Sequence, residues 1–214
     1  MSRDGAPAAV RAWLLYDWAN SAYILTVATA VLPAWFAASV VGPGGAEVLG
    51  LHASATTLWG LTVGLSALAV FALAPVLGAA ADLSNRAASF LRFFCLFGAA
   101  CAFALAFCGP GDALAVMLLF AAAQGCFNCA NVFYDSFLTR VAPPGQEDRV
   151  SGRGFAWGYA GGGLHFLLSL LLIAFAGRLG LTTDGAARLA MASAALWWAG
   201  FSLPAFTALR DAPR

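Results

Sequence analysis

Six long apolar segments, separated by short loops rich in glycine, proline or charge, decide what this chain can fold into. They lie at residues 16–41, 55–81, 89–107, 113–138, 155–176 and 187–209. Each holds about 20 residues or more, which is the length that a helix needs to cross a hydrocarbon core of roughly 30 Å. A chain in lipid must satisfy its own backbone hydrogen bonds, and alternating β patterning is absent, so the segments are predicted to be helices. We therefore expect an all-α membrane protein in which residues 1–214 form a single six-helix transmembrane bundle.

The composition agrees with a membrane location and excludes several classes of function. Hydrophobic residues make up 62% of the 214 residues and charged residues 10%, whereas soluble domains carry roughly 45–50% and about 25%. A net charge of +1 without a basic patch makes a nucleic-acid partner unexpected. The five cysteines all lie in apolar runs, and Cys126 and Cys129, although spaced as C-x-x-C, are expected to serve packing. We expect no metal and no cofactor.

The distribution of arginine predicts the orientation in the membrane. If the N-terminus lies inside, only Arg178 and Arg188 fall in outer loops. The arginines that would then lie inside are Arg3, Arg11, Arg86, Arg92, Arg140, Arg149, Arg153, Arg210 and Arg214. Nine against two is a clear positive-inside bias. The sequence therefore predicts a multi-pass protein of the inner (plasma) membrane with both termini in the cytoplasm.

A stripe of polar residues runs along the fourth segment. Gln124, Asn128, Asn131 and Asp135 are spaced by four, three and four residues, so they share one helical face. Polar groups are costly in hydrocarbon, and this face is therefore expected to point at protein or water. The functional interpretation is a solute cavity, which the ionisable end of the stripe favours. The alternative is interhelical hydrogen bonding, which membrane bundles also use.

The first segment carries a shorter polar face with Asp17, Asn20 and Ser21. In the predicted topology Asp17 and Asp135 both lie at the cytoplasmic ends of their helices, so they are at similar depth and are candidates to face one vestibule. The alternative is that each is an interfacial carboxylate paired with a nearby arginine, Arg11 or Arg140.

The fifth segment combines small residues with a histidine. Gly154, Gly158 and Gly162 form a small-xxx-small face that lets another helix pack backbone to backbone, slide or hinge. His165 lies roughly 18 Å along this helix, near the expected midplane. A proton-coupling role is one hypothesis for His165, and a buried neutral histidine bonded to a neighbouring helix is the alternative that we favour.

Four stretches together resemble a known family. Gly78, Asp82 and Arg86 resemble the signature loop after the second helix of the major facilitator superfamily, although Asn85 replaces its second glycine. The stretches 16–23, 131–138 and 149–163 are similar to the vacuole-effluxer-like branch of that superfamily. The resemblance covers essentially the whole chain and implies the N-terminal six-helix half of a twelve-helix fold, built as a 3+3 inverted repeat.

The resemblance also implies a function. It points to a secondary transporter of small solutes, with amino-acid efflux as the activity of the fungal namesakes, and to a cavity lined by the first and fourth helices. Asp82 and Arg86 would help to latch the inner gate. Because rocking needs two bundles, we expect either a homodimer or a pairing with a second six-helix half. A truncated, inactive half and a non-transporting membrane scaffold are the alternatives.

An enzyme is the other class of function to consider. Aspartyl intramembrane proteases pair two aspartates, and the chain offers Asp17, Asp135 and, in a Gly-Pro-Gly-Asp motif, Asp112. Asp112 and Asp135 are 23 residues apart, about 35 Å along one helix, whereas a catalytic dyad requires about 3 Å. The sequence therefore predicts a transporter that works by alternating access and not an enzyme.

Overall fold

The structure is a computed structural model, and it describes residues 6–84 and 86–211. Within these ranges, six helical stretches are long and apolar enough to cross a membrane. They are Pro7–Val41, Ala55–Ala79, Ala87–Phe107, Ala113–Val141, Glu147–Ala174 and Thr183–Ala208. The expectation of an all-α protein with six membrane-length helices is confirmed.

The stretches are composed of α-, π- and 3₁₀-helical elements joined by short loops. Residues 6–41 hold α1 (Ala6–Ala22), the π-helical η1 (Tyr23–Val31), α2 (Leu32–Trp35) and the π-helical η2 (Phe36–Val41). The remaining long helices and their short extensions are α3 (Ala55–Ser84), α4 (Ala87–Ala104) with η3 (Leu105–Phe107), α5 (Ala113–Ser136) with α6 (Leu138–Val141), α7 (Glu147–Ala174) with η4 (Ala176–Leu179), and α8 (Thr183–Ala208). A two-stranded antiparallel hairpin, β1 (Ala46–Val48) and β2 (Leu51–Ala53), joins η2 to α3.

Several helices begin before the apolar segment that predicts them. The first begins at Ala6 and not at residue 16, and α7 begins at Glu147 and not at residue 155. Hydropathy detects only the part of a helix that lies in hydrocarbon, whereas backbone hydrogen bonding continues the helix into the polar interface. Glu147 and Asp148 in the first turn of α7 also interact favourably with the positive end of the helix dipole.

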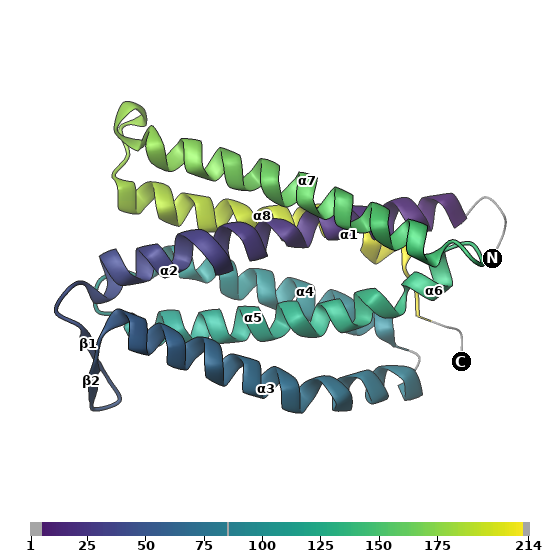
Figure 1. The fold of residues 1–214 in the computed structure, drawn as a ribbon, viewed down its shortest axis with the longest axis horizontal. Helices are drawn as coiled ribbons and strands as arrows, with labels where there is room; N and C mark the ends of the chain where they lie inside the picture. The colour runs from purple at the N-terminus through teal and green to yellow at the C-terminus, as the bar shows by residue number, and fades with distance from the viewer. Residues whose placement is uncertain (1–5, 85, 212–214) are drawn as a thin grey trace.

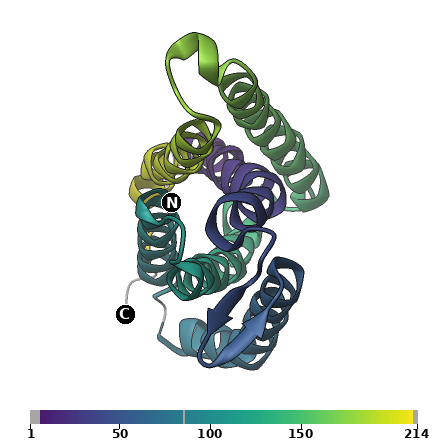
Figure 2. The same ribbon diagram turned by 90° about the vertical axis from the view of Figure 1, so that its left-hand side faces the viewer.

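The long helices form a four-membered ring with two flanking helices (Figures 1 and 2). Around the ring α1 packs on α8, α8 on α4, and α4 on α5. Outside the ring α7 packs on α1, and α3 packs on α5. If the first three membrane helices are exchanged in order with the last three, the same set of contacts results, as an inverted repeat requires. The contact of α1 with α8 then corresponds to that of α5 with α4, and the contact of α1 with α7 to that of α5 with α3. The fourth side of the ring lies between α1 and α5, two ring helices that this exchange interchanges.

An aromatic cluster fills the centre of the ring. The ring centroid of Tyr23 lies 5.1 Å from that of Trp198 and 5.4 Å from that of Phe127. All three side chains are buried. Large apolar side chains on the flanking helices are instead exposed, for example Phe71 on α3 and Leu167 on α7. This distribution, with an apolar outer surface, is what a hydrocarbon solvent favours.

We call the end of the bundle that holds residue 211 the terminal end. Reciprocal caps join α4 and α8 there. The backbone N–H groups of Ala88 and Ser89 donate to Asp211 Oδ1 at 2.8 and 3.2 Å, and so cap the N-terminus of α4. In return, the guanidinium of Arg92 donates to the carbonyl of Phe206 near the end of α8. Partial burial raises the pKa of the Asp211 carboxyl, but the hydrogen bonds from Ser89 and Ala88 and the charge of Arg92 outweigh it and hold that pKa below its usual value.

At the opposite end, which we call the hairpin end, an ion pair and an indole join α2 to α8. Trp35 Nε1 donates to Asp184 Oδ1 at 2.6 Å, and Arg188 Nε lies 2.7 Å from Asp184 Oδ2. The Arg188 guanidinium also lies over the Trp35 ring, 5.6 Å from its centroid. Both ends of the bundle are therefore fastened by polar contacts to α8.

Candidate functional site

A cavity of about 370 Å³ lies between α1 and α5, toward the terminal end. Its walls come from α1, η1, α5, α6 and α7, with no lining residue from α3, α4 or α8 among the residues described. Its lining residues are Trp13, Asp17, Asn20, Ser21, Ile24, Leu25, Phe127, Asn131, Tyr134, Asp135, Leu138, Ser151, Phe155, Gly158 and Tyr159. The cavity thus occupies the fourth side of the ring, between α1 and α5, the first helix of each half of the repeat.

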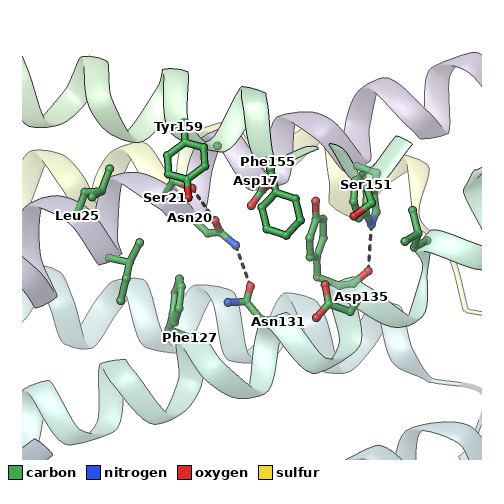
Figure 3. Close-up of a pocket in the computed structure, with 15 residues that line it drawn as sticks. Asp17, Asn20, Ser21, Leu25, Phe127, Asn131, Asp135, Ser151, Phe155 and Tyr159 are labelled. Carbon is green, nitrogen blue, oxygen red and sulfur yellow. Dashed lines mark hydrogen bonds between the residues drawn. The ribbon is translucent and has the colours of Figure 1, made fainter. Parts of the chain in front are cut away.

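The polar faces of α1 and α5 meet in this cavity. Figure 3 shows Asp17 and Asn20 on one side and Asn131 and Asp135 on the other. Asn20 Nδ2 donates to Asn131 Oδ1 at 2.8 Å and bridges the two helices. Ser21 lies beside Asn20 and donates to its Oδ1 at 3.4 Å. The structure therefore brings together all three predicted residues of α1 and two of the four predicted on α5.

The other two residues of the α5 stripe lie outside the cavity lining. Gln124 accepts a hydrogen bond from the Tyr23 hydroxyl at 3.3 Å, which is the interhelical bonding that was the alternative for this stripe. Asn128 is half-buried and makes no side-chain hydrogen bond to the residues described. The stripe leaves the cavity because Phe127, packed on Tyr23, ends the cavity on that side.

The glycine face of α7 packs directly on α1. A Cβ atom at Gly158 would lie 3.0 Å from Asp17 Oδ2 and 2.8 Å from Ser21 Oγ. At Gly154 it would lie 2.6 Å from the Trp13 ring, and at Gly162 it would lie 2.8 Å from the Ser21 carbonyl oxygen. Glycine at these positions therefore lets α7 approach closely enough to cover the α1 side of the cavity.

Gly161 belongs to the same contact, although the small-xxx-small spacing did not select it. Its Cβ would lie 2.6 Å from the backbone oxygen of Trp18. The uninterrupted run Gly161-Gly162-Gly163 could have indicated this contact. The packing face of a helix is wider than a single row of residues spaced four apart.

Aromatic residues of the cavity were also missed from the sequence. Trp13 stacks on Tyr134 with ring centroids 4.4 Å apart and planes 11° apart, and its Nε1 donates to the Tyr134 carbonyl at 3.1 Å. Phe155 and Tyr159 line the cavity from α7. For Trp13 a signal was available, since it lies four residues before Asp17 and shares its helical face. Phe155 and Tyr159 had no such signal, because they belong to another helix whose contact with the cavity does not follow from spacing.

Both cavity carboxylates lack an ion-pair partner among the residues described. Asp17 is half-buried and Asp135 is exposed, and within residues 6–84 and 86–211 neither forms a salt bridge. Arg11 donates instead to the backbone oxygen of Pro7 at 3.3 Å, and the guanidinium of Arg140 lies over the Phe137 ring. The geometry thus does not show the pairing with these arginines that was the alternative for Asp17 and Asp135.

Comparison with known proteins identifies the family. The chain matches the family described as "Vacuole effluxer Atg22 like" over residues 6–146 and 140–214. The chain belongs to this family. It is also similar to the "Uncharacterized MFS-type transporter YxiO" of Bacillus subtilis (strain 168), with 35% identity over 194 residues. That match covers 90% of this chain and 44% of the relative, so the chain spans less than half the length of this curated relative. No solved structure matches the chain significantly.

The family assignment confirms the resemblance seen in the sequence and the fold class drawn from it, one six-helix half of a major facilitator superfamily transporter. The six helices and their pairwise contacts agree with that assignment.

In this Atg22-like chain His165 lies apart from the cavity, between η1, α7 and α8. Thr26 Oγ1 lies 2.9 Å from His165 Nδ1, and Ser193 Oγ lies 3.2 Å from His165 Nε2. The Ser193 hydroxyl donates to the Ala190 carbonyl, so it accepts from Nε2–H, and Thr26 then donates to Nδ1. With a neutral imidazole, both ring nitrogens of His165 and the hydroxyl groups of Thr26 and Ser193 have a hydrogen-bond partner.

Two residues of the signature loop, Gly78 and Arg86, can be placed in this Atg22-like chain, and neither lines the cavity. Gly78 is in α3, where an added Cβ would contact the Val132 side chain of α5 at 4.0 Å. Arg86 is exposed just before α4. The side chain of Asp82 lies outside the described residues, and so does Asn85.

Potential metal ligands, which are His, Cys, Asp and Glu side chains, do not gather in threes in the described part of this Atg22-like chain. The cysteines are free and buried, namely Cys95, Cys101, Cys108, Cys126 and Cys129. The cavity can therefore offer hydrogen bonds, negative charge and aromatic surface to a solute.

Proposed function

We propose that the chain is a transporter half that moves a small solute by alternating access, with the α1–α5 cavity as its part of the solute pathway. The observation that carries the proposal is the bridged polar seam of Asp17, Asn20, Asn131 and Asp135 lining one cavity. Polar groups on membrane helices that face a cavity mark substrate or ion pathways. The family membership supports transport in general.

Each part of the site has a role in this proposal. Asn20, Ser21 and Asn131 contact the solute, while Asp17 and Asp135 set the charge at the mouth of the cavity. The glycine face of α7 lets this helix slide on α1 as the cavity opens and closes. Gly78, Asp82 and Arg86 form part of the inner gate.

A second six-helix bundle completes the pathway in this proposal. It is either another copy of this chain or a second six-helix half. The cavity is walled by α1, α5 and α7 of this chain alone, and transport by rocking requires a second bundle to move against. We place both termini in the cytoplasm of an inner (plasma) membrane protein, because nine of the eleven arginines then lie inside.

The solute class and the driving force complete the proposal. Amino acids are the solutes that the family resemblance implies, and a solute or proton gradient is the proposed driving force. The alternative is a non-transporting scaffold or an inactive half, which would need no accessible polar cavity.

Flux through vesicles tests the proposal. The full chain would be reconstituted and the efflux of a mixture of radiolabelled amino acids measured under an imposed proton gradient. Asn131→Leu and Asp135→Asn should each lower the rate about tenfold, since the first removes a polar partner of the solute and the second removes a charge at the mouth of the cavity. Asp148→Asn, an exposed carboxylate on α7 outside the cavity, is the matched control and should leave it unchanged. Equal flux in all three variants would defeat the cavity assignment, and no flux in the unmodified chain would favour the scaffold.

A further inference from the structure

We propose that the cavity selects solutes by a positively charged amino group, which binds between Asp17 and Asp135. This inference rests on the proposed function, because it takes the cavity as the solute site and names the chemistry that it recognises. In this proposal the cavity recognises only the ammonium group, so an amino acid does not need its carboxylate to bind to this half.

The charges that line the cavity are all of one sign among the residues described. Asp17 comes from α1 and Asp135 from α5, so carboxylates lie on both walls. The chain has no lysine, and within residues 6–84 and 86–211 no arginine or histidine lines the cavity. Two carboxylates in a partly desolvated cavity attract a cation and repel an anion.

A buried hydroxyl gives a second, independent indication of a ligand. Tyr134 lines the cavity and is 5% exposed, yet its Oη has no hydrogen-bond partner among the described residues. Buried polar groups are almost always hydrogen-bonded, and an exception requires an explanation. An ammonium group held by the neighbouring carboxylates would donate to this oxygen and satisfy it.

Aromatic surface around the carboxylates fits the same ligand. Trp13 and Tyr134 form a stacked pair on one side, and Phe155 and Tyr159 line the cavity from α7. Aromatic faces attract cations through their quadrupole and provide apolar contact for the rest of the solute. Sequence alone did not indicate this, because the aromatic residues come from three helices.

A solute without an amino group should bind poorly. A free carboxylic acid would meet two carboxylates and find no cation on this half. An amino acid would bind through its ammonium group, with its own carboxylate directed toward the second bundle.

Three probes that share a phenyl ring separate these possibilities. Phenethylamine carries only the cation, phenylalanine carries both charges, and 3-phenylpropionate carries only the anion. Binding to the purified full chain in mild detergent would be followed by isothermal titration calorimetry at pH 7.5. Phenethylamine and phenylalanine should bind with affinities within a few-fold of each other, and 3-phenylpropionate should bind at least about tenfold more weakly.

Variants assign the binding to this cavity. Asp17→Asn and Asp135→Asn should each weaken phenethylamine about tenfold, and Asp148→Asn should not. Tyr134→Phe should also weaken it without lowering the thermal unfolding temperature of the ligand-free protein, because the hydroxyl has no partner to lose. Binding of 3-phenylpropionate as tight as that of phenethylamine, or amine binding that is insensitive to Asp17, Asp135 and Tyr134, would overturn the inference.

The outcome is separable from that of the proposed function. Vesicle flux that depends on Asn131 while phenethylamine fails to bind would refute the amine selectivity and keep the transporter. Amine binding that depends on both aspartates, without any flux of phenethylamine or phenylalanine, would keep the site and refute the transporter.

Discussion

At the scale of single residues, the glycines of α7 show how a missing side chain builds the site. Gly158 allows α7 to cover Asp17 and Ser21, while Gly161 meets the backbone of Trp18, which has no freedom to rotate away. Gly163, in contrast, has open space where a Cβ would be. Neighbouring glycines in one run therefore differ in how much a methyl group would cost.

This difference predicts opposite effects of the same substitution. Gly161→Ala should destabilise the protein by about 1–3 kcal/mol, because its Cβ would lie 2.6 Å from the Trp18 backbone oxygen. Gly163→Ala should be neutral or stabilise by up to about 1 kcal/mol through helix propensity. Thermal unfolding in detergent measures both. Equal melting temperatures for the two variants would show that α7 does not pack on α1 in this way.

His165 is a second residue whose role is decided by its partners. His165→Leu should lower the unfolding free energy by about 1–3 kcal/mol, because the buried hydroxyl of Thr26 loses its acceptor. If His165 serves as the neutral bridge that its bonds indicate, the pH profile of vesicle flux should keep its shape in this variant. A profile that flattens between pH 5 and 8 would instead support the proton-coupling hypothesis.

At the scale of helices, the caps between α4 and α8 make stability depend on one carboxylate. The pKa of Asp211 lies below its usual value in the folded protein, so folding favours the charged form. The stabilisation is fully present above the unfolded-state pKa of about 4. It is lost as the pH falls through the lower folded-state pKa, when the carboxyl is protonated and the N–H groups of α4 lose a charged acceptor.

Asp211→Asn keeps an oxygen that can accept from α4 but removes its charge. It should therefore lower the melting temperature at pH 7, by an amount that corresponds to about 0.3–1 kcal/mol. The difference from the unmodified protein should shrink as the pH falls below 4. Glu47→Gln, at an exposed position of the hairpin strand β1 and away from any helix N-terminus, is the matched control. A constant difference between the Asp211 variant and the unmodified protein across this pH range would contradict the cap.

The sequence predicted the helices well and the site in part, for different physical reasons. Lipid imposes length and apolarity on each spanning segment, so the six helices could be recognised from hydropathy alone. The faces that carry Asp17 and Asp135 followed from helical spacing. Contacts between helices do not follow from one sequence, so Phe155 and Tyr159 were missed and Gln124, which bonds to Tyr23, was assigned to the cavity.

The irregular backbone of η1 is a further feature that could not be predicted from the sequence. The π-helical η1 begins one residue after Ala22 and follows directly on the polar face of α1. Thr29 Oγ1 bonds to the Ile24 carbonyl, five residues earlier, as the wider turn allows. The segment YILTVATAV has no glycine or proline to mark it, although π-helical turns occur frequently at functional sites.

At the scale of the whole molecule, the arrangement of helices separates a front from a back. We call the side that holds α1, α3, α5 and α7 the front, which lies to the right in Figure 2, and the side that holds α4 and α8 the back, which lies to the left. The cavity belongs to the front, since α4 and α8 contribute none of its described lining residues. A second bundle that completes the pathway must therefore meet the front.

If the second bundle is another copy of the chain, two copies should associate front to front. The mass of the protein in mild detergent, from light scattering after size exclusion, should equal two chains. Spin labels attached after Tyr159→Cys, on α7 beside the cavity, should then lie closer together across the pair than labels attached after Leu96→Cys on α4. The native cysteines are buried, so labelling should be selective for the added thiols. A mass of one chain would contradict the homodimer and leave a second six-helix half as the completing bundle. Shorter distances at position 96 would place the interface on the back and leave the cavity facing lipid.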